Sequence, residues 1–99
     1  MTKKTGISMG QLVMTRGVND RIADDLGFAK HVTDSLARYR GQDWGDVQED
    51  SQQMNDAAIQ SGGDRIFAAY EHHSHEDWRI WIITEWDRSY TTILFPDEY

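Results

Sequence analysis

The sequence predicts an α+β fold: a four-stranded, largely antiparallel sheet with two or three helices packed on one face. Two patterns lead to this fold class. Apolar residues recur at helical spacing in the first half of the chain, whereas β-branched and aromatic residues gather in short runs after residue 64. The chain has 99 residues with four Trp, four Tyr and three Phe, so a single domain over 1–99 can bury a core without disulfide or metal staples.

The first elements are predicted to be a strand and a helix. Residues 1–9 are polar and are expected to be frayed, and residues 11–15 are expected to form a short strand. Asn19 or Asp20 then offers a short polar side chain that can cap the amides of a first helical turn, and Gly27 is expected to end or bend that helix.

A second helix is predicted from a stripe of four apolar residues. Phe28, Val32, Leu36 and Tyr39 follow one another at intervals of four, four and three, which places them on one helical face. Gly41 is expected to terminate this helix, because glycine is the usual residue at a helix C-terminus. The stripe is therefore expected to face the core.

The segment from Val47 to Gln60 is predicted to be a surface helix. Asp46 is well placed to cap it, and the glycines at 62 and 63 follow it. Its apolar stripe of Val47, Met54 and Ala58 is weak, which indicates a helix lying lightly on the domain.

Three strands are predicted over residues 66–70, 78–86 and 91–95, joined as an antiparallel meander that Pro96 ends. In the middle strand, alternation places Trp78 and Trp86 on one face and Trp81 on the other, and we favour core or partly covered positions for these rings over an exposed interface. The predicted core consists of Phe28, Val32, Leu36, Ile80, Ile82 and Ile93.

Charge is distributed unevenly along the chain. Residues 1–40 carry a net charge of +3 and residues 41–99 a net charge of −10, which together give the formal charge of −7. A surface this acidic repels phosphate backbones and anionic lipids and attracts basic protein patches. We therefore expect a basic protein partner and neither direct nucleic-acid binding nor membrane binding.

The chain offers no nucleophile motif. It has no cysteine, and neither a Gly-x-Ser-x-Gly elbow nor a Gly-rich phosphate loop occurs. No catalytic residue and no cofactor is predicted, and the protein is expected not to be an enzyme. The N-terminal residues lack the apolar run of a signal peptide, so we expect a soluble cytoplasmic protein.

The richest group of metal-ligand side chains is the run from Glu71 to Asp77, which includes His72, His73 and His75. Two histidines spaced by two can share a face of a strand, and with a neighbouring carboxylate they can hold Zn²⁺ or Ni²⁺. The run also falls where a hairpin turn belongs, and polar turn residues need no ligand. We favour the turn and predict no metal site.

Acidic residues crowd the loop and helix start at residues 43–50. Carboxylates there can bind Mg²⁺ or Ca²⁺, but the EF-hand pattern is not met, and the helix dipole explains acids at a helix start by itself. For Trp44 in this loop, we favour a side chain that plugs into the core over one that is exposed as an anchor for a partner. The residues proposed to form a partner-binding site are Asp43, Trp44, Asp46, Glu49 and Asp50.

Segments along nearly the whole chain resemble a family of small proteins of bacterial plasmids and integrative elements, usually labelled plasmid-related proteins. The likeness rests on residues 13–18, 28–30, 35–36, 43–46, 80–85, 87–89 and 91–99. Some members carry the label type I restriction endonuclease subunit M. That label does not fit here, because a methyltransferase subunit needs a nucleotide-binding fold and an Asn-Pro-Pro-aromatic motif that this sequence lacks.

The resemblance implies a role in evading host defence. Small acidic proteins of mobile elements often inhibit a restriction or CRISPR effector by occupying its basic nucleic-acid channel, which makes an anti-CRISPR or anti-restriction protein the leading hypothesis. Two alternatives stay open. One is a metal-dependent hydrolase that uses the His or Asp cluster, and the other is a non-catalytic interaction module for maintenance or transfer of the element.

Overall fold

The computed structural model describes residues 7–99. Its elements are β1 (Gln11–Met14), α1 (Arg16–Asp24), α2 (Leu26–Arg40), α3 (Glu49–Ser61), β2 (Ile66–His72), β3 (His75–Thr84), β4 (Tyr90–Leu94) and the 3-10 helix η1 (Pro96–Glu98). The expectation of a frayed start lies outside the described residues for 1–6. It is wrong for Ile7 and Met9, which pack against the core.

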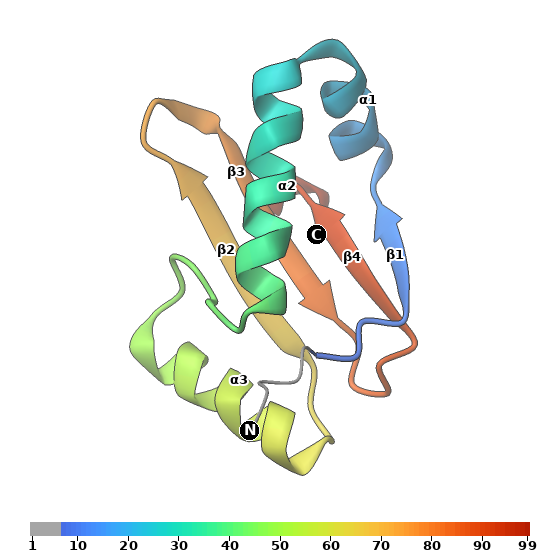
Figure 1. The fold of residues 1–99 in the computed structure, drawn as a ribbon, viewed down its shortest axis with the longest axis vertical. Coiled ribbons are helices and arrows are strands. Elements are labelled where there is room, and N and C mark those ends of the chain that lie inside the picture. The colour runs from blue at the N-terminus through green and yellow to red at the C-terminus, as the bar shows by residue number, and fades with distance from the viewer. Residues whose placement is uncertain (1–6) are drawn as a thin grey trace, which may run out of the picture.

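The four strands form one sheet in the order β1-β4-β3-β2 (Figure 1). β2, β3 and β4 form an antiparallel meander, as predicted, and β1 lies parallel to β4 at the edge. The α+β fold with a largely antiparallel sheet is therefore confirmed, with one parallel pair. That pair joins two segments from opposite ends of the chain.

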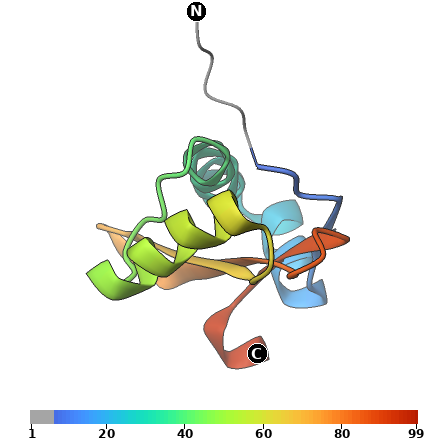
Figure 2. The same ribbon diagram turned by 90° about the horizontal axis from the view of Figure 1, so that it is seen from below.

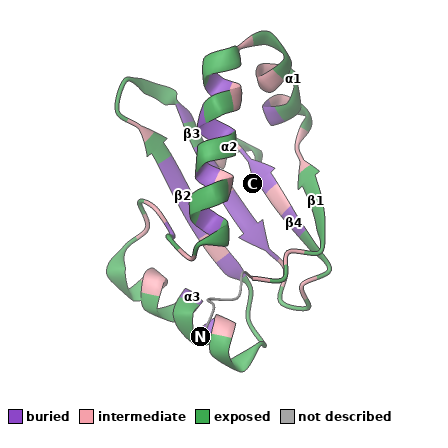
Figure 3. Ribbon diagram, in the orientation of Figure 1, coloured by how far each residue is buried: buried purple, intermediate pink, exposed green. Residues whose placement is uncertain are grey.

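Two of the helices lie on the opposite side of the sheet from the C-terminal turn. Figure 2 shows α2 and α3 above the sheet and η1 below it, while α1 packs against α2 beyond the end of β1. Purple residues in Figure 3 mark the buried face of α2 and the central strands, which is where the core lies.

The predicted core is present. Phe28, Val32, Ile80, Ile82 and Ile93 are buried in one cluster, and Leu36 is partly buried against it. Alternation along β3 directs Trp78 toward the helices, where it is buried, and Trp81 toward the opposite face, where it is half-buried. Trp86 lies beyond the end of β3 and is exposed, so its predicted place in the strand is wrong.

The start of the first helix differs from the prediction. β1 ends at Met14, and Thr15 keeps an extended backbone and caps α1, with its Oγ1 accepting a hydrogen bond from the Val18 amide. Asn19 and Asp20 lie inside the helix instead. The strand passes directly into the helix, so the residue at the junction takes the capping position.

α1 and α2 also meet without a loop. Asp25 closes α1 and caps α2, because its carboxylate accepts hydrogen bonds from the amides of Gly27 and Phe28. Gly27 therefore lies in the first turn of α2 and does not end α1. Gly41 ends α2 as predicted.

The third helix begins later than predicted. Its N-cap is Gln48, which makes no side-chain capping bond, and Asp46 has another role described below. Met54, assigned to the buried stripe, is 71% exposed, whereas Asn55 and Ala58 are buried. No helix within residues 7–99 is both long and apolar enough to cross a membrane.

Candidate partner-binding surface

The loop before α3 is tied to α2 through Asp43. Its carboxylate accepts hydrogen bonds from Nε of Arg38 at 2.8 Å and from the Gly45 amide at 3.1 Å. The Arg38 guanidinium lowers the pKa of Asp43 below its ordinary value. Because its charge is paired with a cation, Asp43 contributes less to an acidic surface than its place in the sequence indicates.

Trp44 plugs the loop into the core. It is 3% exposed, its ring meets Tyr39 at a centroid distance of 5.4 Å, and its Nε1 donates to Oδ1 of Asp56 on α3 at 2.9 Å. The core-plug hypothesis is confirmed. Trp44 can support a partner-binding surface by holding the loop and α3 together, but its ring does not face solvent.

Asp46 fastens the same loop to the edge of the sheet. Its amide donates to the Ala69 carbonyl at 2.7 Å, and its Oδ2 accepts from the Glu71 amide at 2.9 Å. Gly45 approaches Ala69 so closely that the two form an isolated parallel bridge. Asp46 therefore extends the pairing of β2 instead of capping α3.

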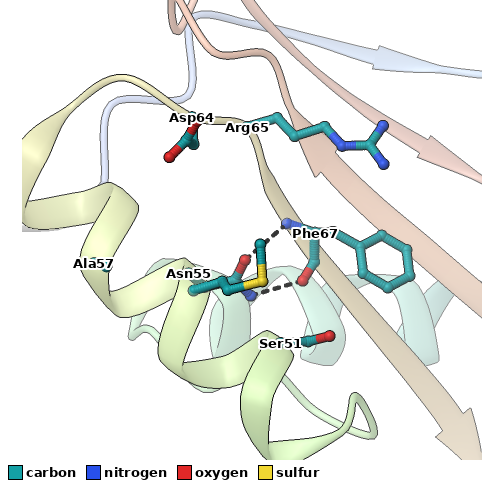
Figure 4. A pocket seen from close by; sticks show the side chains of 7 residues that line it. Ser51, Asn55, Ala57, Asp64, Arg65 and Phe67 are labelled. Atoms are coloured by element: carbon teal, nitrogen blue, oxygen red, sulfur yellow. Dashed lines mark hydrogen bonds between the residues drawn. The ribbon is translucent and has the colours of Figure 1, made fainter.

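Asn55 is a structural residue that the sequence-based reasoning missed. It is 4% exposed, and its side-chain amide donates to the Phe67 carbonyl at 2.7 Å and accepts from the Phe67 amide at 3.2 Å (Figure 4). An amide side chain carries the same donor and acceptor as a peptide group, so Asn55 takes the place of a neighbouring strand. In the sequence, Asn55 precedes Ala58 and Ile59 by three and four residues, and this helical spacing was the signal that could have identified it.

Together these contacts close the outer edge of β2. The outward amides and carbonyls of Phe67 and Ala69 and the amide of Glu71 all find partners on α3 or on the loop. An open strand edge is a template for pairing with another chain, so covering this edge prevents that pairing. It also fixes α3 beside the sheet.

A further tie comes from Arg88 in the turn between β3 and β4. Its guanidinium donates to the carbonyls of Ala58 at 3.1 Å and Asp64 at 2.7 Å, as well as to two carbonyls of its own turn. Arg88 thus also anchors the C-terminal end of α3.

The outer side of α3 carries the charge. Glu49 and Asp50 lie in the first helical turn and are exposed, and Asp56 is exposed directly after the buried Asn55. Acids in the first turn are stabilised by the helix dipole, typically by about 0.3–1 kcal/mol each. We call Asp46, Glu49, Asp50 and Asp56 the acidic face. Residues 42–64 contain no Lys or Arg to neutralise it.

Basic residues elsewhere are partly paired. Arg21 donates to Asp77 at 2.6 Å, and Lys30 donates to Asp34 at 2.8 Å. The charges of these two cations are therefore partly offset by neighbouring acids.

Beside the acidic face, a groove of about 390 Å³ runs between α3 and β2 (Figure 4). It is lined by Ser51, Met54, Asn55, Ala57, Asp64, Arg65 and Phe67. The groove has one acid and one base in its lining, and no described group in it is arranged as a nucleophile with a base.

The sheet face opposite the helices is aromatic and partly covered. The Tyr99 ring lies against Trp81 at a centroid distance of 5.7 Å, and Nη1 of Arg65 donates to its hydroxyl at 2.6 Å. The favoured hypothesis of core or partly covered aromatics is confirmed for Trp78 and Trp81.

The histidine run forms the ends of β2 and β3, with a turn at His73 and Ser74. Asp77, one of the possible metal ligands, is paired with Arg21. Within residues 7–99, no three His, Asp or Glu side chains are placed so that they could hold a metal ion.

Comparison with known proteins assigns neither a family nor a function to the chain. No family model matches the sequence, and no curated protein and no solved structure matches it either. The candidate site thus depends on the geometry of this chain.

Proposed function

We propose that this chain is a non-enzymatic binding protein that occupies the basic nucleic-acid-binding surface of a protein partner through its acidic face. The observation that supports this most is that the segment carrying the acidic face has no basic side chain of its own and is held in place by several contacts. Residues 42–64 carry no basic side chain, and the loop and α3 that display the acids are fixed to the sheet by Asn55, Trp44 and Arg88.

Rigid attachment matters for binding energetics. A charged surface that is already ordered loses little conformational entropy when a partner docks, so more of the electrostatic attraction remains as affinity. Long-range attraction between opposite charges also speeds the encounter and weakens as salt is added. Both properties suit a protein that competes with nucleic acid for a basic channel.

The resemblance to mobile-element proteins supports a restriction or CRISPR effector as the class of partner. Such effectors hold nucleic acid in positively charged channels, and an acidic protein in the channel excludes the phosphate backbone. The proposal is therefore an anti-restriction or anti-CRISPR inhibitor of the host.

The structure decides which acids are suitable for a test. Asp43 and Asp46 make structural hydrogen bonds, and Asp56 holds Trp44, so reversing their charge would disturb the fold as well as the surface. Glu49 and Asp50 are exposed, and no ion pair involves either side chain in the described residues. The variant of choice is E49K/D50K.

A matched control exists on α1. Asp20 and Asp24 are exposed and make no ion pair among residues 7–99, so D20K/D24K raises the formal charge by the same four units from −7. Circular dichroism and thermal unfolding verify that both variants fold.

The assay measures DNA cleavage by purified restriction and CRISPR effectors with increasing amounts of each protein. We expect the parent and D20K/D24K to inhibit at least one effector, and E49K/D50K to need about tenfold more protein or higher. Equal inhibition by all three proteins, equal loss in both variants, no inhibition of any effector, or tight binding of the parent to DNA at physiological salt contradicts the proposal.

A further inference from the structure

All four histidines of the chain gather at one place in the fold, although one of them is far from the others in sequence. His31 projects from α2 and meets His72 of β2 edge to face, with ring centroids 5.3 Å apart. His72 stacks on His73 at 4.7 Å, and His75 stacks on Trp78 at 3.8 Å. Figure 1 shows this end of the β2–β3 hairpin beside the N-terminal half of α2.

His31 is the buried member of the cluster. It is 7% exposed, its ring lies 6.0 Å from Trp78 and 6.3 Å from Phe28, and its Nε2 is buried without a hydrogen-bond partner. A neutral imidazole fits such a position, whereas a protonated one would place a charge in a buried site and a proton on an Nε2 that has no hydrogen-bond partner. Burial lowers the pKa of His31, and His72 lowers it further.

The groups that face the cluster do not cancel this penalty. Asp34 on α2 and the backbone of Tyr70 and Trp78 favour the charged His31, but the net shift of its pKa is downward. Asp77 on β3 already pairs with Arg21 of α1. On the hairpin itself, burial, His73 and His75 lower the pKa of His72, so each proton added makes the next less favourable.

From this arrangement we propose that the cluster is a pH-sensitive latch between α2 and the β2–β3 hairpin. Neutral rings pack together and hold the hairpin on the helix, and protonated rings repel one another and release it. The latch is independent of the proposed function, but a hydrogen bond connects it to the acidic face. The amide of Glu71, next to His72, donates to the carboxylate of Asp46.

The direction of the pH effect follows from the lowered pKa of His31. The unfolded chain takes up the proton near the ordinary pKa of 6.5, whereas the folded chain takes it up only at lower pH. The stabilising effect is therefore complete above pH 6.5 and is lost as the pH falls through the pKa of His31 in the folded state.

The test compares the parent with His31→Phe, which keeps an aromatic ring among Phe28 and Trp78 but cannot take a proton. Gln53→Ala, at an exposed position of α3 outside the cluster, serves as the control. Thermal unfolding is measured at several pH values from 7.5 down to 5. We expect the Tm of the parent and of Gln53→Ala to fall by about 5 °C more than that of His31→Phe.

Two NMR measurements on the parent make the proposal testable even if His31→Phe does not fold. The ring protons of His31 should titrate below pH 6.5, and hydrogen exchange of amides in residues 70–80 should accelerate about tenfold more than in β4 when the pH is lowered, after correction for intrinsic rates. Titration of His31 at or above 6.5, parallel Tm curves for all proteins, or uniform exchange across the sheet overturns the latch.

Discussion

At the scale of single residues, the molecule depends on side chains that imitate backbone. Asn55 gives β2 the donor and acceptor that another strand would provide, and the carboxylate of Asp46 accepts the next outward amide along the edge. Such residues are hard to identify in a sequence, because their partners lie on a strand that is distant along the chain. Trp44 was predictable as a plug, since a large apolar ring in a polar loop is usually buried.

The first residue-scale prediction concerns Asn55→Ala. The substitution leaves both the amide and the carbonyl of Phe67 without their partner, and a buried unsatisfied polar group costs about 1–3 kcal/mol. We expect urea unfolding to show a loss of about 3 kcal/mol in the free energy of unfolding. Gln53→Ala, on the exposed side of the same helix, should change it by less than about 0.5 kcal/mol. Similar losses in the two variants would show that Asn55 does not close the edge.

Gly45→Ala and Gly62→Ala provide a second pair of matched variants. Both glycines have a positive φ, of 75° and 69°, which strains any residue with a side chain. A Cβ at Gly45 would also collide with the Ala69 carbonyl oxygen and the Tyr70 ring, whereas a Cβ at Gly62 would meet nothing within 4 Å. We expect Gly62→Ala to cost about 1 kcal/mol and Gly45→Ala on the order of 4 kcal/mol in thermal unfolding. Equal losses of stability in the two variants would contradict the close approach of the loop to β2.

At the scale of elements, side-chain hydroxyls link α2 to the sheet. Thr91 of β4 donates to the Met9 carbonyl at 2.7 Å, so it accepts from Thr84 of β3 at 2.7 Å, and Thr84 in turn accepts from the Tyr39 hydroxyl at 2.6 Å. Each hydroxyl has one proton, which fixes the direction of the whole series. Tyr39 is the first donor, so the series depends on its remaining protonated.

This dependence predicts a loss of stability in alkaline solution. Burial raises the pKa of Tyr39 from 10.0 to about 12, so the folded state favours the neutral phenol. The contribution of Tyr39 to the stability of the fold is complete below pH 10 and is lost as the pH rises through about 12.

We expect Tyr39→Phe to cost about 1 kcal/mol at pH 7 and to lose less stability than the parent above pH 10, as followed by urea unfolding. Tyr70, whose pKa burial also raises, should keep part of the alkaline sensitivity in the variant. Identical alkaline losses in parent and variant would contradict the role of Tyr39.

Element types were easier to predict than element ends. The stripe of Phe28, Val32 and Tyr39 and the β-rich runs after residue 64 identified α2 and the meander, because burial imposes those periods on the sequence. Helix starts were less predictable, since Thr15, Asn19 and Asp20 all have capping side chains. Only the end of β1 determines that Thr15 is used.

At the scale of the whole molecule, the sequence indicated a strongly acidic half but not how its charges are used. The structure divides these acidic residues into those that have a structural partner and those that project into solvent. Asp43 and Asp77 are paired with arginines, and Asp46 and Asp56 accept structural hydrogen bonds. Glu49 and Asp50 project from α3 without an ion pair in the described residues, and Asp50 accepts a hydrogen bond from the adjacent Ser51 amide. This division depends on distances between elements, which composition and spacing do not contain.

The parallel pairing of β1 with β4 has a consequence for how the protein is made. The meander of β2, β3 and β4 needs only local chain reversals, so it can form as soon as those residues are available. β1 must instead find residues 90–93 across almost the full length of the chain, which carries a larger loop-closure entropy. During synthesis β1 leaves the ribosome long before β4, so it stays unpaired until β4 has been made, and until then the edge of β4 is open.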